Sequence, residues 1–207
     1  MRFRIISLIF AYFIFAYFPS ISKAGNERTY CTSVKPKQYN DVWKRQFESD
    51  FKINYDIVDE EFIFYSSEPI SIFGFALTIE QKDSLISRIN KYKRWNLKAS
   101  RKKVKLEKQI GIVHAKYTFW RLGDEWSLGP GCDIEVYFLS QTDQIHQMVL
   151  VFPKVRSRSN EFDTHKGEPL YFDWKSASEL ARVLSKPYFD KFIEEVRKQD
   201  ELDKEFQ

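Results

Sequence analysis

The stretch WRLGDEWSLGPGCDIEVYF, residues 120–138, contains the turn on which the predicted fold depends. Its Gly-Pro-Gly segment, residues 129–131, is typical of a break between regular elements. On either side, residues 111–120 and 132–139 alternate apolar and polar side chains, as strands with one buried face do. We therefore interpret the stretch as the connection of an antiparallel hairpin, tied by Cys132 to the N-terminal arm, rather than as an active-site loop.

The polar side chains of this hairpin are predicted to share one face of a sheet. A symmetric register would place Thr118 opposite Glu135 and Trp120 opposite Asp133, with His114 on the same face. The Cβ atoms of Asp133 and Glu135 would be about 7 Å apart. Carboxylates at a comparable spacing serve glycoside hydrolysis. His114, Asp133 and Glu135 are thus the catalytic candidates of an alternative, enzymatic interpretation, while a solvated sheet face explains the same pattern.

The rest of the chain predicts a mixture of strands and helices. Strand-like runs cover residues 52–58, 62–65, 70–77 and 145–152. Helices are predicted over residues 40–51, 78–97 and 176–184 and from Pro187 onward, with a capping box formed by Thr78 and Gln81. Residues 154–169 lack periodicity and predict an exposed loop. The predicted fold class is α+β: a single domain with an antiparallel meander sheet packed by helices, and one disulfide.

The N-terminal residues have the three-part pattern of a secretory signal. Arg2 and Arg4 precede an apolar run over residues 5–18, and small residues stand at the end of residues 22–24. The apolar run is shorter than the about 20 residues that a membrane-spanning helix needs. We expect cleavage of residues 1–24, a domain over residues 25–207 with a frayed polar C-terminal end, and no stable membrane anchor afterwards. The protein would then be periplasmic or secreted.

The two cysteines, Cys31 and Cys132, are both outside the predicted signal. An even number of cysteines in an exported protein favours pairing. A bridge between them would close a loop of about a hundred residues and stabilise the fold by about 4 kcal/mol on the chain-entropy estimate. We therefore predict a disulfide between Cys31 and Cys132.

The charge of the chain is concentrated in one place. The full chain carries 33 basic and 29 acidic residues, and removal of Arg2, Arg4 and Lys23 leaves 30 and 29, a net charge of +1. This balance gives no support to nucleic-acid binding. Residues 91–108, however, contain a single acid, Glu107, among many lysines and arginines. The candidate binding residues are Lys98, Arg101, Lys102, Lys103, Lys105 and Trp95, with Trp126 in the turn region.

Such a basic segment attracts anionic partners. It is also compatible with a solvated helix end and an edge strand on which lysines block further pairing. The sequence has no HExxH, G-x-S-x-G, Walker or GxGxxG motif, so we expect no metal and no cofactor. The favoured interpretation is an exported, non-catalytic binding module of the inhibitor or immunity type with a protein partner. An anionic envelope component is the second partner class, and a small cell-envelope hydrolase is the alternative function.

Overall fold

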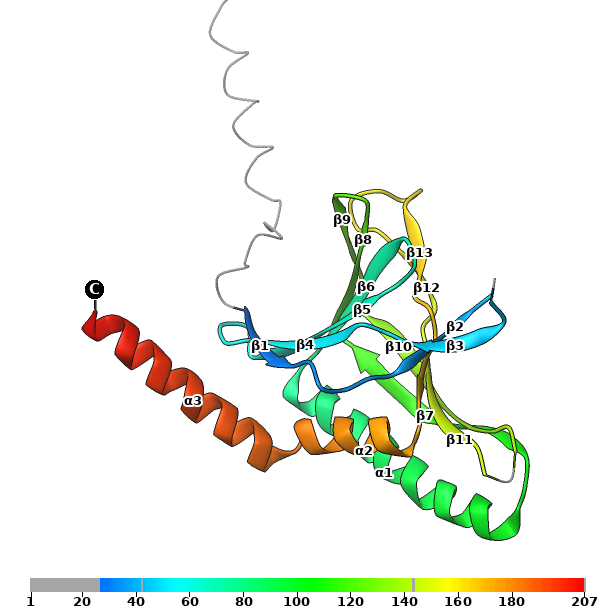
Figure 1. Ribbon diagram of the computed structural model, residues 1–207. Coiled ribbons are helices and arrows are strands. Elements are labelled where there is room, and N and C mark those ends of the chain that lie inside the picture. The colour runs from blue at the N-terminus through cyan, green and yellow to red at the C-terminus, as the bar shows by residue number, and fades with distance from the viewer. Residues whose placement is uncertain (1–26, 42, 143, 207) are drawn as a thin grey trace, which may run out of the picture.

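The computed structural model describes residues 27–41, 43–142 and 144–206. The predicted signal, residues 1–24, lies outside these residues. The described residues form a single α+β domain of antiparallel sheets and three helices (Figure 1). The predicted fold is therefore wrong in part: the class is α+β, but the strands form two six-stranded sheets and a two-stranded ribbon instead of one meander, and the predicted disulfide is absent from the described residues.

The first sheet consists, in spatial order, of β1 (Glu27–Cys31), β4 (Phe51–Asp56), β5 (Glu61–Ser67), β6 (Ser71–Leu77), β8 (Tyr117–Leu122) and β9 (Glu125–Gly129). The second sheet consists of β3 (Arg45–Glu48), β2 (Lys37–Asn40), β14 (Leu170–Phe172), β11 (His146–Val151), β10 (Cys132–Ser140) and β7 (Leu106–Ala115). The ribbon consists of β12 (Lys154–Arg156) and β13 (Thr164–Lys166). The ribbon occupies the segment that was predicted to be an exposed loop.

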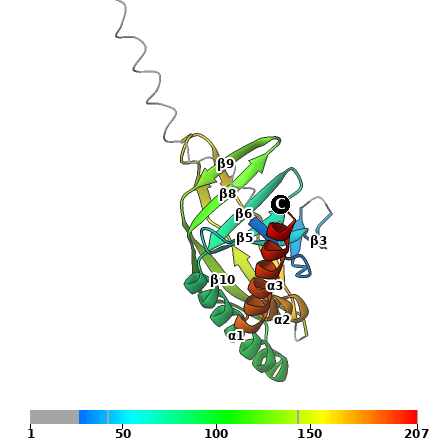
Figure 2. The same ribbon diagram turned by 90° about the vertical axis from the view of Figure 1, so that its left-hand side faces the viewer.

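The three helices are α1 (Ile79–Lys102), α2 (Trp174–Val183) and α3 (Lys186–Glu205). Helix α1 begins with the predicted capping box, because the Thr78 side chain accepts from the Gln81 N–H and the Gln81 side chain accepts from the Thr78 N–H. Helices α1 and α2 contact each other and pack on the sheets (Figure 2). Helix α3 projects away from the body, continues through the end that was predicted to fray, and has no buried residue (Figure 1).

The chain passes from the second sheet to the first at Lys116, between β7 and β8. Before this point β7 pairs with β10, where Ala115 lies opposite Cys132. After it β8 pairs with β6, where Tyr117 lies opposite Ala76. The prediction of one strand over residues 111–120 is therefore wrong, since these residues belong to two strands in different sheets.

The predicted hairpin register is wrong for the same reason. Strand β10 pairs with β7, so that His114 lies opposite Asp133 and Ile112 lies opposite Glu135. Residues 117–129 form a separate hairpin, β8–β9, within the first sheet. The Trp120 side chain points into the core and is 2 % exposed.

The predicted helix over residues 40–51 is also wrong. These residues form the turn and second strand of the β2–β3 hairpin and the start of β4. Trp43 is 67 % exposed, whereas Phe51 is 1 % exposed, so the two aromatic side chains do not share a buried face. Trp43 lies in the turn between β2 and β3, and Phe51 begins β4.

The predicted disulfide between Cys31 and Cys132 is wrong, since both are free thiols. Cys31 ends β1 in the first sheet, where it is buried and its Sγ lies 3.2 Å from Ser33 Oγ. Cys132 begins β10 in the second sheet and lies opposite Ala115 of β7. An even cysteine count carries no information about this placement in different sheets.

We expect two free thiols by mass spectrometry. Burial, together with the charge of Asp133, raises the pKa of Cys132 to about 11. The native Cys132 thiol should therefore react with iodoacetamide at pH 8 about a hundredfold more slowly than an unperturbed thiol, because the thiolate is the nucleophile. In denaturant without reductant, both Cys31 and Cys132 should be labelled. Failure of both to react in denaturant would contradict the free-thiol assignment.

Candidate functional site

The basic segment surrounds the C-terminal end of α1. Lys103 caps the helix in the left-handed conformation, with φ 52°, and its N–H donates to the Ala99 carbonyl. The chain then turns and enters β7 at Leu106. Five cations occupy this helix end and turn, and all are exposed: Lys98, Arg101, Lys102, Lys103 and Lys105. We call these five residues the basic tip.

Part of the wider basic segment has a structural role. Strand β7 lies at one edge of the second sheet. Lys91 Nζ donates to the Ile110 carbonyl at 2.7 Å, and Arg88 Nε donates to the Ile112 carbonyl at 3.3 Å. These two side chains of α1 satisfy carbonyl groups of the edge strand, which would otherwise be open to further pairing. Lys91 therefore fits the interpretation of the basic segment as a protected edge strand, and the basic tip fits the other part of that interpretation, a solvated helix end.

The cations of the basic tip lack acidic partners. Among the described residues, no carboxylate lies within 4 Å of a basic-tip nitrogen. By contrast, Lys186, Lys191 and Lys198 of α3 each pair with an acid four positions away in the sequence. Cations at a helix C-terminus interact favourably with the helix dipole. All five side chains are exposed to solvent.

Apolar side chains are exposed in the same segment. Leu97 is 52 % exposed, Val104 38 % and Leu106 41 %. Each lies within one or two positions of a basic-tip residue in the sequence. A surface that combines exposed aliphatic groups with cations can provide both apolar contact area and electrostatic attraction.

The two predicted tryptophans occupy other environments. Trp95 is half-buried, with Lys91 Nζ 5.1 Å and Lys108 Nζ 5.6 Å from its ring, and it packs edge-on against Phe138. Trp126 lies on β9 of the first sheet, where the Arg121 guanidinium is 5.4 Å from its ring. The structure therefore places Trp95 beside the basic tip as part of the α1–β7 packing, and Trp126 on another sheet.

The alternative catalytic residues lie on the outer face of the second sheet. His114 Nδ1 and Asp133 Oδ1 are 2.5 Å apart, with side chains 72 % and 59 % exposed. Glu135, two residues along the same strand, accepts a hydrogen bond from the Tyr137 hydroxyl at 3.0 Å. The structure thus brings His114 and Asp133 together in a water-exposed position. Bulk water screens such a pair.

Two buried polar networks were not found from the sequence. Glu61 is 2 % exposed and accepts hydrogen bonds from Lys116 Nζ, at 2.5 Å, and from the Tyr117 hydroxyl. Burial and the neighbouring Glu61 carboxylate raise the pKa of Tyr117. Glu27 accepts from the Tyr65 hydroxyl at 2.8 Å on the same outer face of the first sheet. Partners more than 35 positions apart leave no local pattern in a single sequence.

The second network links the ribbon to the first sheet. His165 Nε2 of β13 lies 2.9 Å from Glu68 Oε2, and the histidine ring stacks against Phe73 and Trp120. The Glu168 N–H donates to Glu68 Oε1 at 2.7 Å. His165 was predicted to lie in an exposed loop, and instead it is held in aromatic packing with a buried carboxylate partner.

Within the described residues, no group of three or more histidine, cysteine or acidic side chains is arranged to hold a metal ion. None of the described helices is long and apolar enough to cross a membrane. Comparison with known protein families, curated proteins and solved structures found no match.

Proposed function

We propose that the protein is an exported, non-catalytic binding module of the inhibitor or immunity type, which docks its basic tip on an acidic surface of a partner protein. The observation that supports this proposal is the set of five exposed cations without acidic partners in the described part of the chain. Complementary charge accelerates encounter and excludes wrong partners. The aliphatic side chains in the same segment add apolar contact.

A protein partner agrees better with the basic tip than a lipid surface or a nucleic acid does. Peripheral membrane contacts commonly use an aromatic anchor at the interface. The nearby tryptophan, Trp95, is instead enclosed by Lys91, Lys108 and Phe138. The nearly neutral charge balance of residues 25–207 gives no support to nucleic-acid recognition.

The expectation of export is based on the signal-like sequence of residues 1–24 alone. We expect the protein recovered from its producing cells to have lost these residues. Its intact mass would test this directly, and a mass that includes Met1 would contradict cleavage.

Charge reversal tests the binding proposal. In the test variant, glutamate replaces all five basic-tip residues. In the control variant, glutamate replaces five exposed cations elsewhere, so both variants have the same net charge: Lys35, Lys154, Arg156, Arg158 and Lys175. Photo-crosslinking from Ser100, an exposed residue near the helix end, would capture the partner in envelope extracts. With the purified partner, we expect the test variant to bind at least about tenfold more weakly and the control to bind as the parent does.

Added salt should weaken binding of the parent, because exposed charges are screened. Equal binding of the parent and the test variant would exclude the basic tip as the interface. Association with anionic phospholipid vesicles that is lost only in the test variant, without a protein crosslink, would replace the protein partner with a membrane. If the parent bound a partner that has no acidic surface, this result would also contradict the proposal.

A further inference from the structure

An acidic cleft lies between the β2–β3 hairpin and the segments next to β5 and β14. Its volume is about 450 Å³. Four acids and two aromatic rings line much of it: Asp41, Glu48, Asp50, Glu168, Tyr39 and Phe47. None of its lining residues is a lysine or an arginine.

Among the described residues, three of the four acids in the cleft have no ion-pair partner. Asp41 forms one ion pair, at 3.6 Å, with the largely exposed Lys44. In the described part of the chain, no cation forms an ion pair with Glu48, Asp50 or Glu168. Burial, and then the charges of Glu68 and Asp41, raise the pKa of Glu168. A cation entering the cleft would relieve this repulsion.

The aromatic walls favour the same kind of ligand. Tyr39 is 42 % exposed and Phe47 is 36 % exposed. The face of an aromatic ring attracts ammonium and guanidinium groups. The Phe47 ring already holds the guanidinium of Arg45, 4.4 Å from its centroid, and Arg45 is not one of the residues that line the cleft. The cleft thus offers both carboxylates and ring surfaces to lysine or arginine side chains.

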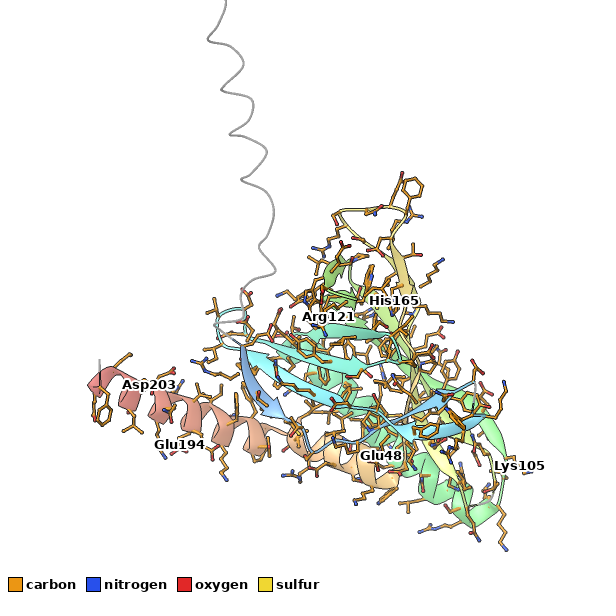
Figure 3. All side chains as sticks on the ribbon, turned by 45° about the horizontal axis from the view of Figure 1, so that its top comes forward. Glu48, Lys105, Arg121, His165, Glu194 and Asp203 are labelled. Atoms are coloured by element: carbon orange, nitrogen blue, oxygen red, sulfur yellow. The ribbon has the colours of Figure 1, made fainter. Side chains whose placement is uncertain are left out.

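We propose that the acidic cleft receives the basic tip of a second copy of the same chain. This inference rests on the proposed function, since it uses the same basic tip. The tip lies at the end of a 24-residue helix, and Lys105 lies at the margin of the molecule (Figure 3). The cleft is concave and carries the opposite charge. Within the described residues, no ion pair joins the two surfaces inside one molecule, so both remain available to another copy.

The contact is heterologous, because different surfaces of the two copies meet. Charge complementarity is its main determinant, and Leu97, Val104 and Leu106 provide apolar contact against Tyr39 and Phe47. Self-association should therefore weaken with salt. It should require both the basic tip of one copy and the cleft of the other.

Analytical ultracentrifugation of the protein expressed from the full chain tests this inference without any other partner. The tip-reversed variant has glutamate at the five basic-tip positions. The cleft-reversed variant has lysine in place of Glu48, Asp50 and Glu168. The control is the five-site variant described above, in which Lys35, Lys154, Arg156, Arg158 and Lys175 are replaced. Circular dichroism would establish that all four proteins are folded.

We expect the parent and the control to associate at low salt, with a dissociation constant that rises at least about tenfold on adding ~0.5 M NaCl. Each reversed variant alone should be monomeric, because like charges would meet. A mixture of the two reversed variants should associate again, since each then offers the charge that the other lacks. This rescue excludes damage to the fold, and the five-site control, which has the same net charge as the tip-reversed variant, separates a specific contact from a general effect of net charge.

A monomeric parent at low salt would overturn self-docking, as would association that persists in both reversed variants or no rescue in their mixture. These outcomes do not decide the proposed function. A monomeric parent that still captures an acidic partner through the basic tip would leave that function intact. A self-associating parent without any captured partner would leave only the contact between copies.

Discussion

Replacement of Phe64 by alanine should lower the free energy of unfolding by about 4 kcal/mol, the largest effect that we expect from a single substitution. Phe64 lies on β5 and is 1 % exposed. Its ring stacks on Phe75 of the adjacent strand, with centroids 4.6 Å apart and an interplanar angle of 4°, and also contacts Phe51. Truncation removes these contacts and leaves a cavity that rigid strands on both sides cannot fill.

Urea unfolding followed by circular dichroism would measure the change. The matched control is Phe162→Ala, because Phe162 is 88 % exposed in the turn between β12 and β13. We expect the control to change stability by no more than about 0.5 kcal/mol. A loss below about 1 kcal/mol for Phe64→Ala would contradict the described packing between β5 and its neighbours.

Replacement of Glu68 by alanine should cost about 3 kcal/mol, the second largest effect. The Glu68 side chain is 4 % exposed. It accepts from the Glu168 N–H at 2.7 Å, from His165 Nε2 at 2.9 Å and from the Ser71 hydroxyl. Alanine removes the carboxylate that accepts all three hydrogen bonds, and hydrogen bonds to a charged group contribute more to stability than bonds between neutral groups. The ribbon should loosen first, because His165 connects β13 to the first sheet.

The same carboxylate predicts a pH dependence. Burial alone would raise the pKa of Glu68, but hydrogen bonds from His165, Ser71 and the Glu168 N–H outweigh it, so the pKa is lowered. A lowered pKa in the folded state contributes stability that is fully present above the unfolded value, about 4.3, and is lost as the pH falls through the folded value. We expect the stability advantage of the parent over Glu68→Gln to shrink as the pH falls below about 4.

Hydrogen exchange would show where the effect acts. Amide protection of residues 154–166 should fall in Glu68→Ala while the protection of α1 persists. Equal stability of the parent and Glu68→Gln at every pH would show that the carboxylate has no special role in the fold.

Local patterns in the sequence predicted several elements correctly. The capping box at Thr78 and the apolar periodicity after it placed α1, and alternating apolar side chains placed β4, β5 and β6. The two C-terminal helices were predicted in the same way. These elements could be found because each depends on residues within about four positions of one another.

The sequence also predicted only part of the candidate sites. The charge of the basic tip follows from composition, since residues 98–105 contain no acid. Only the structure showed that Lys91 serves the edge of β7, and that the five tip residues lack acidic partners within the described chain. The acidic cleft was not predicted, because Asp41, Asp50 and Glu168 come from distant segments.

The sequence by itself determined the fold class, the start of α1 and the charge of the helix end, because these follow from periodicity and composition. The tertiary structure decided the change of sheet at Lys116, the free state of Cys31 and Cys132, and the burial of His165 against Glu68. The physical reason is that these features depend on which strands pair. Strand pairing joins segments far apart in the chain, and no local preference of the residues specifies it.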